Sequence, residues 1–397
     1  MDHRTVNDFT SELEQRLDGL REQNLFRTLR RVDSPQSPHI QINGRTLLNF
    51  SSNDYLGLAN HPALKEAAIH AIEQFGVGSG ASRLVSGSIA PFYELEQALA
   101  GFKNTEASLT FSTGYATAIG TICALLGKDD IIILDKLVHA CIVDAAKLCG
   151  AKIRVFAHND LEDLEDKLKW AKAQTAKQKA RALIVTESIF SMDGDTAPLK
   201  EVIKLKNKFD AWLMLDEAHA TGVIGTDGRG LADELGVTGE VEIQMGTLGK
   251  ALGSSGGYIC GSRALIDLLV NRARSFIFST APVPAAAAAA TAAIQLVQSP
   301  KGEERRKILR QHTEDLNLKF EIRNSKFSSA IVPIILGSED KALAAAHRLR
   351  EQNIFVPAIR YPTVARGKAR LRVTLSAAHS SEDISALANA LKPLIEN

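Results

Sequence analysis

One lysine stands among small residues in the segment Gly246–Tyr258, which reads GTLGKALGSSGGY. Small residues allow a flat group and the backbone to approach each other closely. A lysine in such a confined site can lose its proton and react as a Schiff-base amine. Lys250 is therefore a candidate nucleophile, although a solvated lysine after a glycine turn would give the same pattern.

An acid and a histidine follow an apolar run in the segment Trp212–Gly222, which reads WLMLDEAHATG. Asp216 ends the run and His219 comes three residues later. A carboxylate at the mouth of a buried strand can pair with a protonated pyridine nitrogen, but it can also simply cap the strand. The reactive lysine about one strand and loop later favours the first interpretation.

Two further segments carry polar groups after an apolar run. The segment Phe111–Ala118 (FSTGYATA) passes through a Ser/Thr/Gly turn into a helical pattern, so Gly114 and Tyr115 stand where a helix start could bind a phosphate or merely be capped. His139 follows the run Ile131–Leu134 and could stack on a flat cofactor, although a lone histidine is more often structural.

The elements that must position these residues alternate between apolar runs and helical patterns. The expected strands are Ala107–Phe111, Ile131–Leu134, Lys152–Phe156, Ala182–Thr186, Ala211–Leu215 and Ile243–Thr247. The expected helices between them are Pro91–Phe102, Tyr115–Leu126, His139–Leu148, Asp160–Gln174 and Leu199–Lys208. This alternation predicts an α/β fold with a mainly parallel sheet covered on both faces, whose strand ends share one edge.

The two ends of the chain have a different character, which predicts three parts. Residues 1–49 form an N-terminal arm, in which leucines at helical spacing predict an amphipathic helix over Val6–Arg31 that packs on a larger body. Residues 50–299 form the large domain. Residues 300–397 form a small α+β C-terminal domain that ends in a helix over Ser381–Ile395, with Ser381 as its N-cap.

Composition excludes several classes of protein. The 397 residues include 47 basic and 46 acidic side chains, which gives no general reason to bind nucleic acid or a membrane surface. The apolar stretch Ala281–Val297 is short and rich in alanine, so it predicts a buried helix that begins near Pro284. The four cysteines have no CxxC spacing and no accompanying histidine cluster, so neither a metal site nor a disulfide framework is expected. We expect a cytoplasmic protein.

Five motifs in order resemble the α-oxoamine synthases, which are fold-type I pyridoxal-phosphate enzymes. The motifs are Asn49–Gly57 (NFSSNDYLG), Gly78–Arg83 (GSGASR), Ser191–Asp195 (SMDGD), Asp216–His219 (DEAH) and Thr247–Lys250 (TLGK). The resemblance covers almost the whole chain from Asn49 onward. It implies a seven-stranded sheet, pyridoxal 5'-phosphate as cofactor, and an obligate homodimer with shared active sites.

The resemblance also implies roles for individual residues. Lys250 would form the Schiff base, Asp216 would pair with the pyridine nitrogen, and His219 would contact the ring oxygen. His139 would stack on the ring and help to polarise the acyl carbonyl. The phosphate would be held by Gly114, Tyr115 and Thr247, and by Ser279 and Thr280 of the neighbouring subunit, while Ser188 would reach the cofactor oxygen. The residues implied for substrate are Arg27, Asn53 and Arg372, of which Arg372 would hold the amino-acid carboxylate.

Two stretches of sequence narrow the choice of substrate among the members of this family. Gly78–Gly87 (GSGASRLVSG) and Ile359–Ala378 (IRYPTVARGKARLRVTLSAA) favour a member that condenses L-alanine with a pimeloyl thioester for biotin synthesis. The acyl group would be carried on coenzyme A or on acyl carrier protein. The alternative is another α-oxoamine synthase, such as the ligase that joins glycine to acetyl-CoA, because all members share the cofactor residues. Within the second stretch, Tyr361 and Ala365–Arg366 differ from the residues that are usual at these positions in the family.

Overall fold

The computed structural model describes residues 6–175, 180–320 and 329–395, which form two compact units. The terminal unit contains the described parts of 1–52, 331–374 and 379–397. The large unit contains those of 53–330 and residues 375–378. The expected boundaries lay after residues 49 and 299. In the structure both chain ends contribute to the terminal unit, and the helix that follows residue 299 groups with the large unit.

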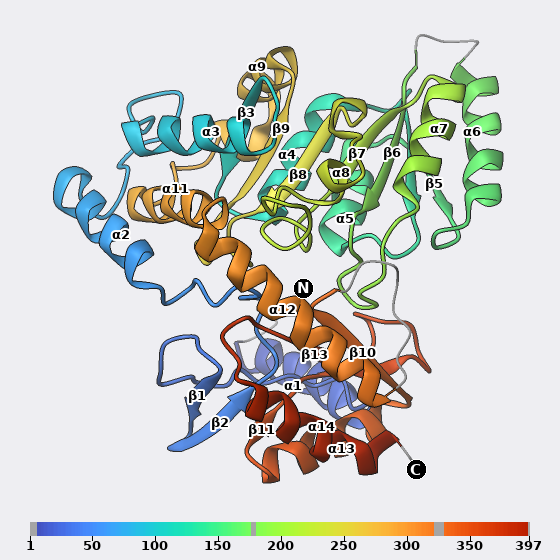
Figure 1. The fold of residues 1–397 in the computed structure, drawn as a ribbon. Helices are drawn as coiled ribbons and strands as arrows, with labels where there is room; N and C mark the ends of the chain where they lie inside the picture. The colour runs from blue at the N-terminus through green and yellow to red at the C-terminus, as the bar shows by residue number, and fades with distance from the viewer. Residues whose placement is uncertain (1–5, 176–179, 321–328, 396–397) are drawn as a thin grey trace. The chain divides into compact units, whose positions relative to one another are not determined.

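Seven strands of the large unit form one sheet (Figure 1). They are β3 (Ala107–Phe111), β4 (Ile131–Asp135), β5 (Lys152–Phe156), β6 (Ala182–Glu187), β7 (Trp212–Asp216), β8 (Ile243–Thr247) and β9 (Gly257–Gly261). Their order across the sheet is β3-β9-β8-β7-β6-β4-β5. The pairs among β4 to β8 are parallel, whereas β9 runs antiparallel to β8 and β3 on either side of it.

Helices cover both faces of this sheet. Ile132 and Leu134 of β4 share a core cluster with residues of α4 (Gly114–Leu125) and α5 (Ala140–Cys149). Successive strand residues point to opposite faces, and the intervening Ile133 is also fully buried, so the second face is covered as well. Near-continuous burial of this kind is typical of a parallel sheet between helical layers.

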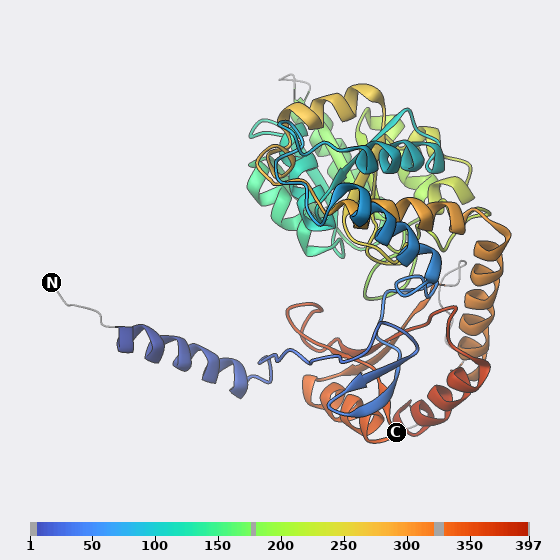
Figure 2. The ribbon, with the colours of Figure 1, turned by 90° about the vertical axis from the view of Figure 1, so that its left-hand side faces the viewer.

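The remaining helices of the large unit surround this core. They are α2 (Pro62–Phe75), α3 (Ala90–Phe102), α6 (Leu161–Thr175), α7 (Leu199–Phe209), α8 (Leu231–Glu234), α9 (Arg263–Arg272), α10 (Arg274–Ile277), α11 (Pro284–Val297) and α12 (Pro300–Phe320). The alanine-rich α11 packs against α2 and α3, which lie beside it in both views (Figure 1, Figure 2). This helix begins at Pro284, as predicted. No helix in the described ranges has the length and apolar character needed to cross a membrane.

The terminal unit contains two small sheets and three helices. One sheet has the order β1-β2-β11 and the other β10-β13-β12. The strands are β1 (His39–Ile42), β2 (Arg45–Asn49), β10 (Ile331–Gly337), β11 (Ile354–Phe355), β12 (Ala358–Ile359) and β13 (Ala369–Thr374). The helices are α1 (Val6–Glu22), α13 (Glu339–Glu351) and α14 (Ser381–Ile395).

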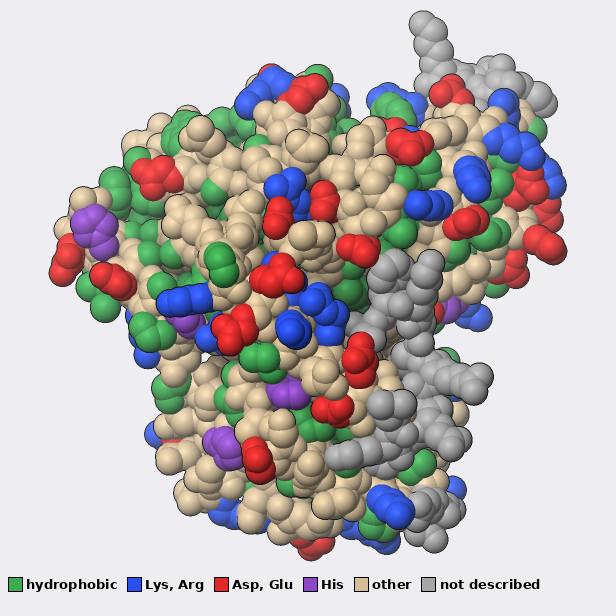
Figure 3. All heavy atoms as spheres, viewed as in Figure 1, with side chains coloured by type: hydrophobic (Ala, Val, Ile, Leu, Met, Phe, Trp, Pro, Cys, Tyr) green, Lys and Arg blue, Asp and Glu red, His purple; other side chains and the backbone are tan. Residues whose placement is uncertain are grey.

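Charges of both signs are interspersed on the surface. Figure 3 shows basic and acidic side chains side by side over α6 and α7 at the upper right. Ion pairs there include Lys167 with Asp163, and Lys208 with Glu165 from one helix to the other. Exposed pairs of this kind are screened by solvent and contribute little to stability.

The fold-class prediction is confirmed, with local corrections. All six apolar runs are strands, β3 to β8, but β9 escaped prediction because it begins and ends in glycine, which is depleted in strands. Helix α1 stops at Glu22, because Asn24 takes a left-handed conformation (φ 56°) that ends the helix. Its apolar Phe9 is 63% exposed, so the expected packing of this arm is not seen in the single chain.

The predicted N-cap of the last helix was wrong by one residue. The Ser380 hydroxyl accepts a hydrogen bond from the Asp383 amide at 3.1 Å, and the Asp383 carboxylate accepts one from the Ser380 amide at 2.9 Å. This reciprocal pair is a capping box. Ser380, rather than Ser381, therefore caps α14.

Candidate active site

The residues singled out in the large unit gather at one edge of the sheet. Strands β6, β7 and β8 are parallel and in register, with Glu187 beside Asp216 and Asp216 beside Met245. Their carboxyl ends consequently lie along a single line, which continues into Thr247 at the end of β8. This edge is where ligands bind in open α/β sheets.

A helix start lies against this edge because a glycine makes room for it. The Thr113 side chain caps α4 by accepting a hydrogen bond from the Ala116 amide at 3.0 Å. The first-turn N–H groups of Gly114 and Tyr115 therefore point out of the helix end, where no intrahelical partner exists. A Cβ on Gly257 would come within 2.9 Å of the Gly114 backbone, so only glycine lets the strand and helix meet. The arrangement suits an anionic group such as phosphate.

Thr247 borders the same place. It pairs with Gly257 in the β8–β9 ladder, and its hydroxyl donates to the Gly256 carbonyl at 3.0 Å. The Tyr115 ring points elsewhere, since its hydroxyl donates to the Asp144 carboxylate at 2.7 Å. Any contact from Tyr115 to a ligand at the helix start is therefore made by its backbone.

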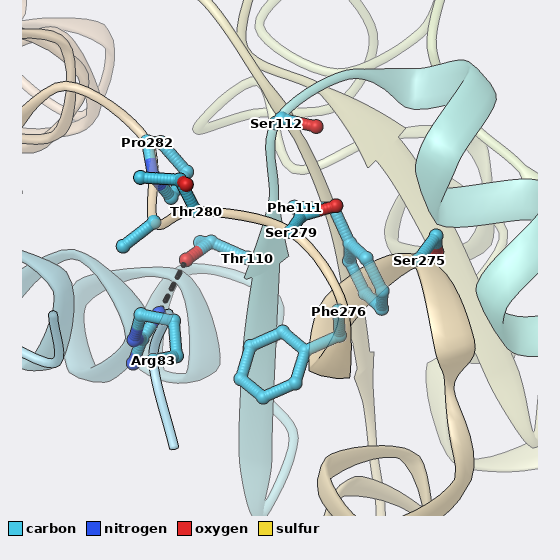
Figure 4. Close-up of a pocket in the computed structure, with 10 residues that line it drawn as sticks. Arg83, Thr110, Phe111, Ser112, Ser275, Phe276, Ser279, Thr280 and Pro282 are labelled. Carbon is cyan, nitrogen blue, oxygen red and sulfur yellow. Dashed lines mark hydrogen bonds between the residues drawn. The ribbon is translucent and has the colours of Figure 1, made fainter. Parts of the chain in front are cut away.

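Ser279 and Thr280 border a pocket on their own chain (Figure 4). The pocket is also lined by Ser112, one residue before the cap of α4. Thr280 bridges to Ser82, and Arg83 beside it forms a paired salt bridge with Glu96 at 3.0 Å. The GSGASR motif thus holds the 279–282 segment, through the Ser82–Thr280 bridge and a hydrogen bond from the Ser79 hydroxyl to the Pro282 carbonyl at 2.6 Å, and its arginine is committed to Glu96.

Lys250 begins a chain of hydrogen bonds within the large unit. Its Nζ lies 2.7 Å from His219 Nε2, and His219 Nδ1 lies 2.5 Å from the Tyr55 hydroxyl. The Tyr55 hydroxyl in turn donates to Asn53 Oδ1 at 3.2 Å. When the lysine ammonium donates to Nε2, the histidine proton must be on Nδ1, from which it donates to Tyr55. We call this chain, from Lys250 through His219 and Tyr55 to Asn53, the relay.

Asp216 lies buried beside the relay, with 5% of its surface exposed. Its Oδ1 accepts a hydrogen bond from the Ala218 amide at 2.9 Å. Burial raises the pKa of this carboxyl, and the nearby Lys250 ammonium is the first influence that opposes the rise. Ser188 is fully buried next to it and donates its hydroxyl to the Asp216 main-chain carbonyl at 3.1 Å, so it supports the strand end.

His139 caps helix α5. Its Nδ1 accepts a hydrogen bond from the Cys141 amide at 3.2 Å, which assigns the ring proton of the neutral form to Nε2. Partial desolvation lowers the pKa of His139; Asp216 opposes this shift and Lys250 adds to it. The ring is therefore neutral near pH 7 and carries an Nε2–H donor. Its backbone amide donates to Glu187 Oε1 at 2.6 Å.

The two predicted substrate arginines belong to the terminal unit. Arg372 in β13 is 5% exposed and donates to Thr374 Oγ1 at 3.0 Å. Arg27 is exposed and donates to the Tyr361 carbonyl at 3.3 Å. This bond joins the N-terminal arm to the loop around Tyr361, whose sequence differs from that usual in the family. The structure thus brings Arg27 and that loop together, while their relation to Lys250 stays a prediction.

Two residues that the sequence did not single out join the site. Tyr55 lies within the quoted NFSSNDYLG motif and is buried, with 1% exposure, which a tyrosine tolerates only when its hydroxyl is bonded. Glu187 is an acid at the end of an apolar strand, the same signal that identified Asp216. Position at the carboxyl end of a neighbouring parallel strand would have found it.

The comparisons with known proteins agree with this geometry. The family model for aminotransferase class I and II matches residues 45–391. A protein named 8-amino-7-oxononanoate synthase from Geotalea daltonii is 47% identical over 95% of this chain and 96% of its own. A putative 8-amino-7-oxononanoate synthase from Desulfovibrio desulfuricans is 43% identical over 96% and 98%.

Solved structures share the whole fold. A serine palmitoyltransferase from S. paucimobilis with a bound PLP–myriocin aldimine superposes with a TM-score of 0.89 at 28% identity, covering 98% of both chains. An 8-amino-7-oxononanoate synthase from Francisella tularensis gives a TM-score of 0.74 at 28% identity, covering 88% of this chain and 97% of that one. The chain belongs to the aminotransferase class I and II family.

Proposed function

We propose that this chain is a pyridoxal-phosphate-dependent 8-amino-7-oxononanoate synthase. It condenses L-alanine with a pimeloyl thioester, releasing CO2 and the free thiol, in biotin synthesis. The observation that carries the proposal is the convergence of Lys250, His219 and buried Asp216 at one edge of the sheet, in a chain 47% identical to proteins of that name. The relatives named here give no support to a ligase that uses glycine and acetyl-CoA.

The residues present fit the cofactor. The start of α4, made accessible by Gly257, offers N–H donors for its phosphate, and the Thr247 hydroxyl can donate to it by turning away from the Gly256 carbonyl. Asp216 offers a buried carboxylate for its ring nitrogen, and Lys250 offers the amine for its aldehyde. When bound, the cofactor supplies an electron sink for the carbanion at the amino-acid Cα.

Lys250 has the properties of a general base. Once its amine is exchanged for that of the substrate, its Nζ can take the Cα proton and later return one. The relay sets where that nitrogen lies, because His219 Nε2 holds it at 2.7 Å and Tyr55 fixes the histidine tautomer. Asn53, at the far end of the relay, extends the same network toward the substrate.

His139 and Arg372 act on the substrates. The neutral His139 ring presents its Nε2–H to the thioester carbonyl, where negative charge develops as the new carbon–carbon bond forms and the thiolate leaves. Arg372 binds the amino-acid carboxylate with its guanidinium, and Arg27 meets the acyl chain. Carbon balance agrees with the name, since alanine without its carboxylate adds two carbons to the seven of pimeloyl.

The assembly and location are part of the same proposal. The enzyme is a cytoplasmic homodimer, in which Ser279 and Thr280 of one subunit serve the phosphate of the partner's cofactor. The acyl group arrives on coenzyme A or on acyl carrier protein.

A product assay tests the substrate assignment. Purified enzyme is given L-alanine with pimeloyl-CoA, L-alanine with pimeloyl acyl carrier protein, or glycine with acetyl-CoA, and thiol and CO2 release are measured. We expect turnover with one or both pimeloyl donors at least about 100-fold above the glycine pair, the discrimination that a mismatched acyl pocket and amino acid provide together. Preference for glycine and acetyl-CoA would overturn the assignment.

A further inference from the structure

A second buried carboxyl stands beside Asp216. Glu187 ends β6, is 2% exposed, and is the register partner of Asp216 across the parallel β6–β7 ladder. Register partners in a parallel pair project their side chains to the same face of the sheet. Two acids are thus buried next to each other, a costly arrangement that structural needs alone seldom justify.

The Glu187 carboxylate joins two loops of the site. It accepts a hydrogen bond from the His139 amide at 2.6 Å, and another from the backbone N–H of Ser191. The first donor follows β4 and the second follows β6, so one side chain fixes the segments after two neighbouring strands. A carboxyl oxygen accepts from backbone N–H groups in either protonation state, and most strongly when the group is ionised.

The bond to His139 determines how its ring is held. The amide is bound by Glu187, and Nδ1 is bound by the Cys141 amide at 3.2 Å. With the main chain and one ring nitrogen both fixed, the ring has little freedom about its side-chain bonds. Without the Glu187 bond, the contacts of the ring with the amide and thiol of Cys141 are what remains to hold it.

Glu187 also adds a second titratable carboxyl to the site. The charged groups that act on it are Asp216 from β7 and Lys250 from the loop after β8. Burial, and next the Asp216 carboxylate, raise the pKa of Glu187 to about 8, and Lys250 opposes this. Lys250 likewise opposes the rise at Asp216. The two carboxyls and the amine therefore form one electrostatic group.

We propose that Glu187 is a positioning residue that fixes the His139 ring and places a second titratable carboxyl beside Asp216. What the ring does there rests on the proposed function, whereas the positioning itself does not. Glu187 touches no reacting atom in this assignment. It acts through His139 and Asp216.

Hydrogen exchange on the full chain without cofactor tests the positioning. In Glu187→Ala the His139 amide should exchange about tenfold faster or more, because its acceptor is gone, whereas Glu187→Gln should restore most of the protection through its amide oxygen. Asp130→Ala is the matched control, since Asp130 is buried and accepts two backbone amides at the opposite edge of the sheet. It should leave His139 exchange no more affected than that of other sheet amides.

The cofactor-loaded enzyme tests the coupling between the two carboxyls. In Glu187→Gln the pH midpoint of the visible cofactor band should shift by about half a unit or more, while Asp130→Ala leaves it in place. Glu187→Ala should lower kcat about tenfold or more, and Glu187→Gln should restore most of that loss.

Two results would overturn the proposal. One is an unchanged exchange rate of the His139 amide in Glu187→Ala, and the other is an unchanged pH midpoint of the cofactor band in Glu187→Gln. If Glu187→Ala loses protection of the His139 amide but the wild-type enzyme does not turn over pimeloyl thioesters, the positioning proposal stands and only the assigned substrate is refuted.

Discussion

The two edges of the seven-stranded sheet both carry acids, and they use them differently. At the amino edge, Asp130 accepts the Gly127 and Arg181 amides, each at 2.9 Å. Glu242 at the same edge pairs with Lys206 at 2.6 Å. At the carboxyl edge, Asp216 and Glu187 lie side by side, and Lys250 is the cation that acts on both.

This difference separates acids that only stabilise the fold from acids that act on a ligand. A carboxylate that meets backbone amides or a cation of its own has been compensated for the loss of water. Two adjacent buried carboxyls that share one lysine are compensated only in part, even though each also accepts a backbone amide, and burial raises the pKa of both. Buried acids with raised pKa values are found mainly at functional sites, where they interact with a ligand. The variants below test this contrast, from the largest expected effect on activity to the smallest.

Replacing the lysine should have the largest effect. Lys250→Ala removes both the Schiff-base amine and the general base, so kcat/KM should fall by at least about 10⁴-fold. The visible cofactor band should disappear in an absorption spectrum. Lys250→Arg keeps the positive charge but is no nucleophile, so it should be equally inactive. Substantial turnover in either variant would contradict the assignment.

Neutralising the buried acid should have the next largest effect. Asp216→Asn keeps the shape and the acceptor for the Ala218 amide but removes the charge that would keep the pyridine nitrogen protonated. We expect kcat/KM to fall by about 10²–10³-fold, the range for loss of one preorganised electrostatic contact. Steady-state kinetics and the band position measure it. Asp130→Asn, at the other edge, serves as the matched control and should keep wild-type kinetics.

Shortening the relay should have a moderate effect. Tyr55→Phe leaves the His219 Nδ1–H buried without its acceptor, which costs about 1–3 kcal/mol, and about a tenfold lower kcat/KM should follow. Tyr258→Phe is a suitable control, because its buried hydroxyl bonds to Thr221 at 2.9 Å outside the relay. Equal kinetic losses in both variants would mean that the relay has no special role.

The smallest effect on activity is expected from a charge cluster that only supports the fold. His158 lies 3.0 Å from Asp135 and 2.7 Å from Asp195. Desolvation alone would lower its pKa, but the hydrogen bonds to both carboxylates raise it to about 10. The folded state therefore holds this proton more tightly than the unfolded chain, in which the pKa is near 6.5.

The resulting stability is fully present below about pH 6.5 and is lost as the pH rises through about 10. Urea unfolding at a series of pH values measures it, with His158→Gln as the comparison. The wild-type free energy of unfolding should fall more steeply with pH over this window than that of the variant. At neutral pH the variant should keep kcat within about twofold, because the cluster touches none of the proposed reacting groups.

Local patterns predicted the strands and the acid of the site, because both signals are carried by neighbouring residues. Asp216 is recognisable as the polar end of an apolar run. The relay was not predictable in the same way, since His219 and Tyr55 are 164 positions apart and meet only after the chain folds. The position of Glu187 beside Asp216 follows from the register of β6 against β7, which cannot be read from either segment alone.

The antiparallel strand β9 has a consequence for which substitutions the chain can accept. Because it runs against its neighbours, its first residue, Gly257, lies where the other strands end. A single methyl group there would come within 2.5 Å of Thr117 Oγ1. Even alanine is thus excluded, and every sequence that keeps this fold and this helix start must keep glycine at that position. In a library of random variants, Gly257 should tolerate no replacement, whereas the exposed face of α6 a few strands away should accept many.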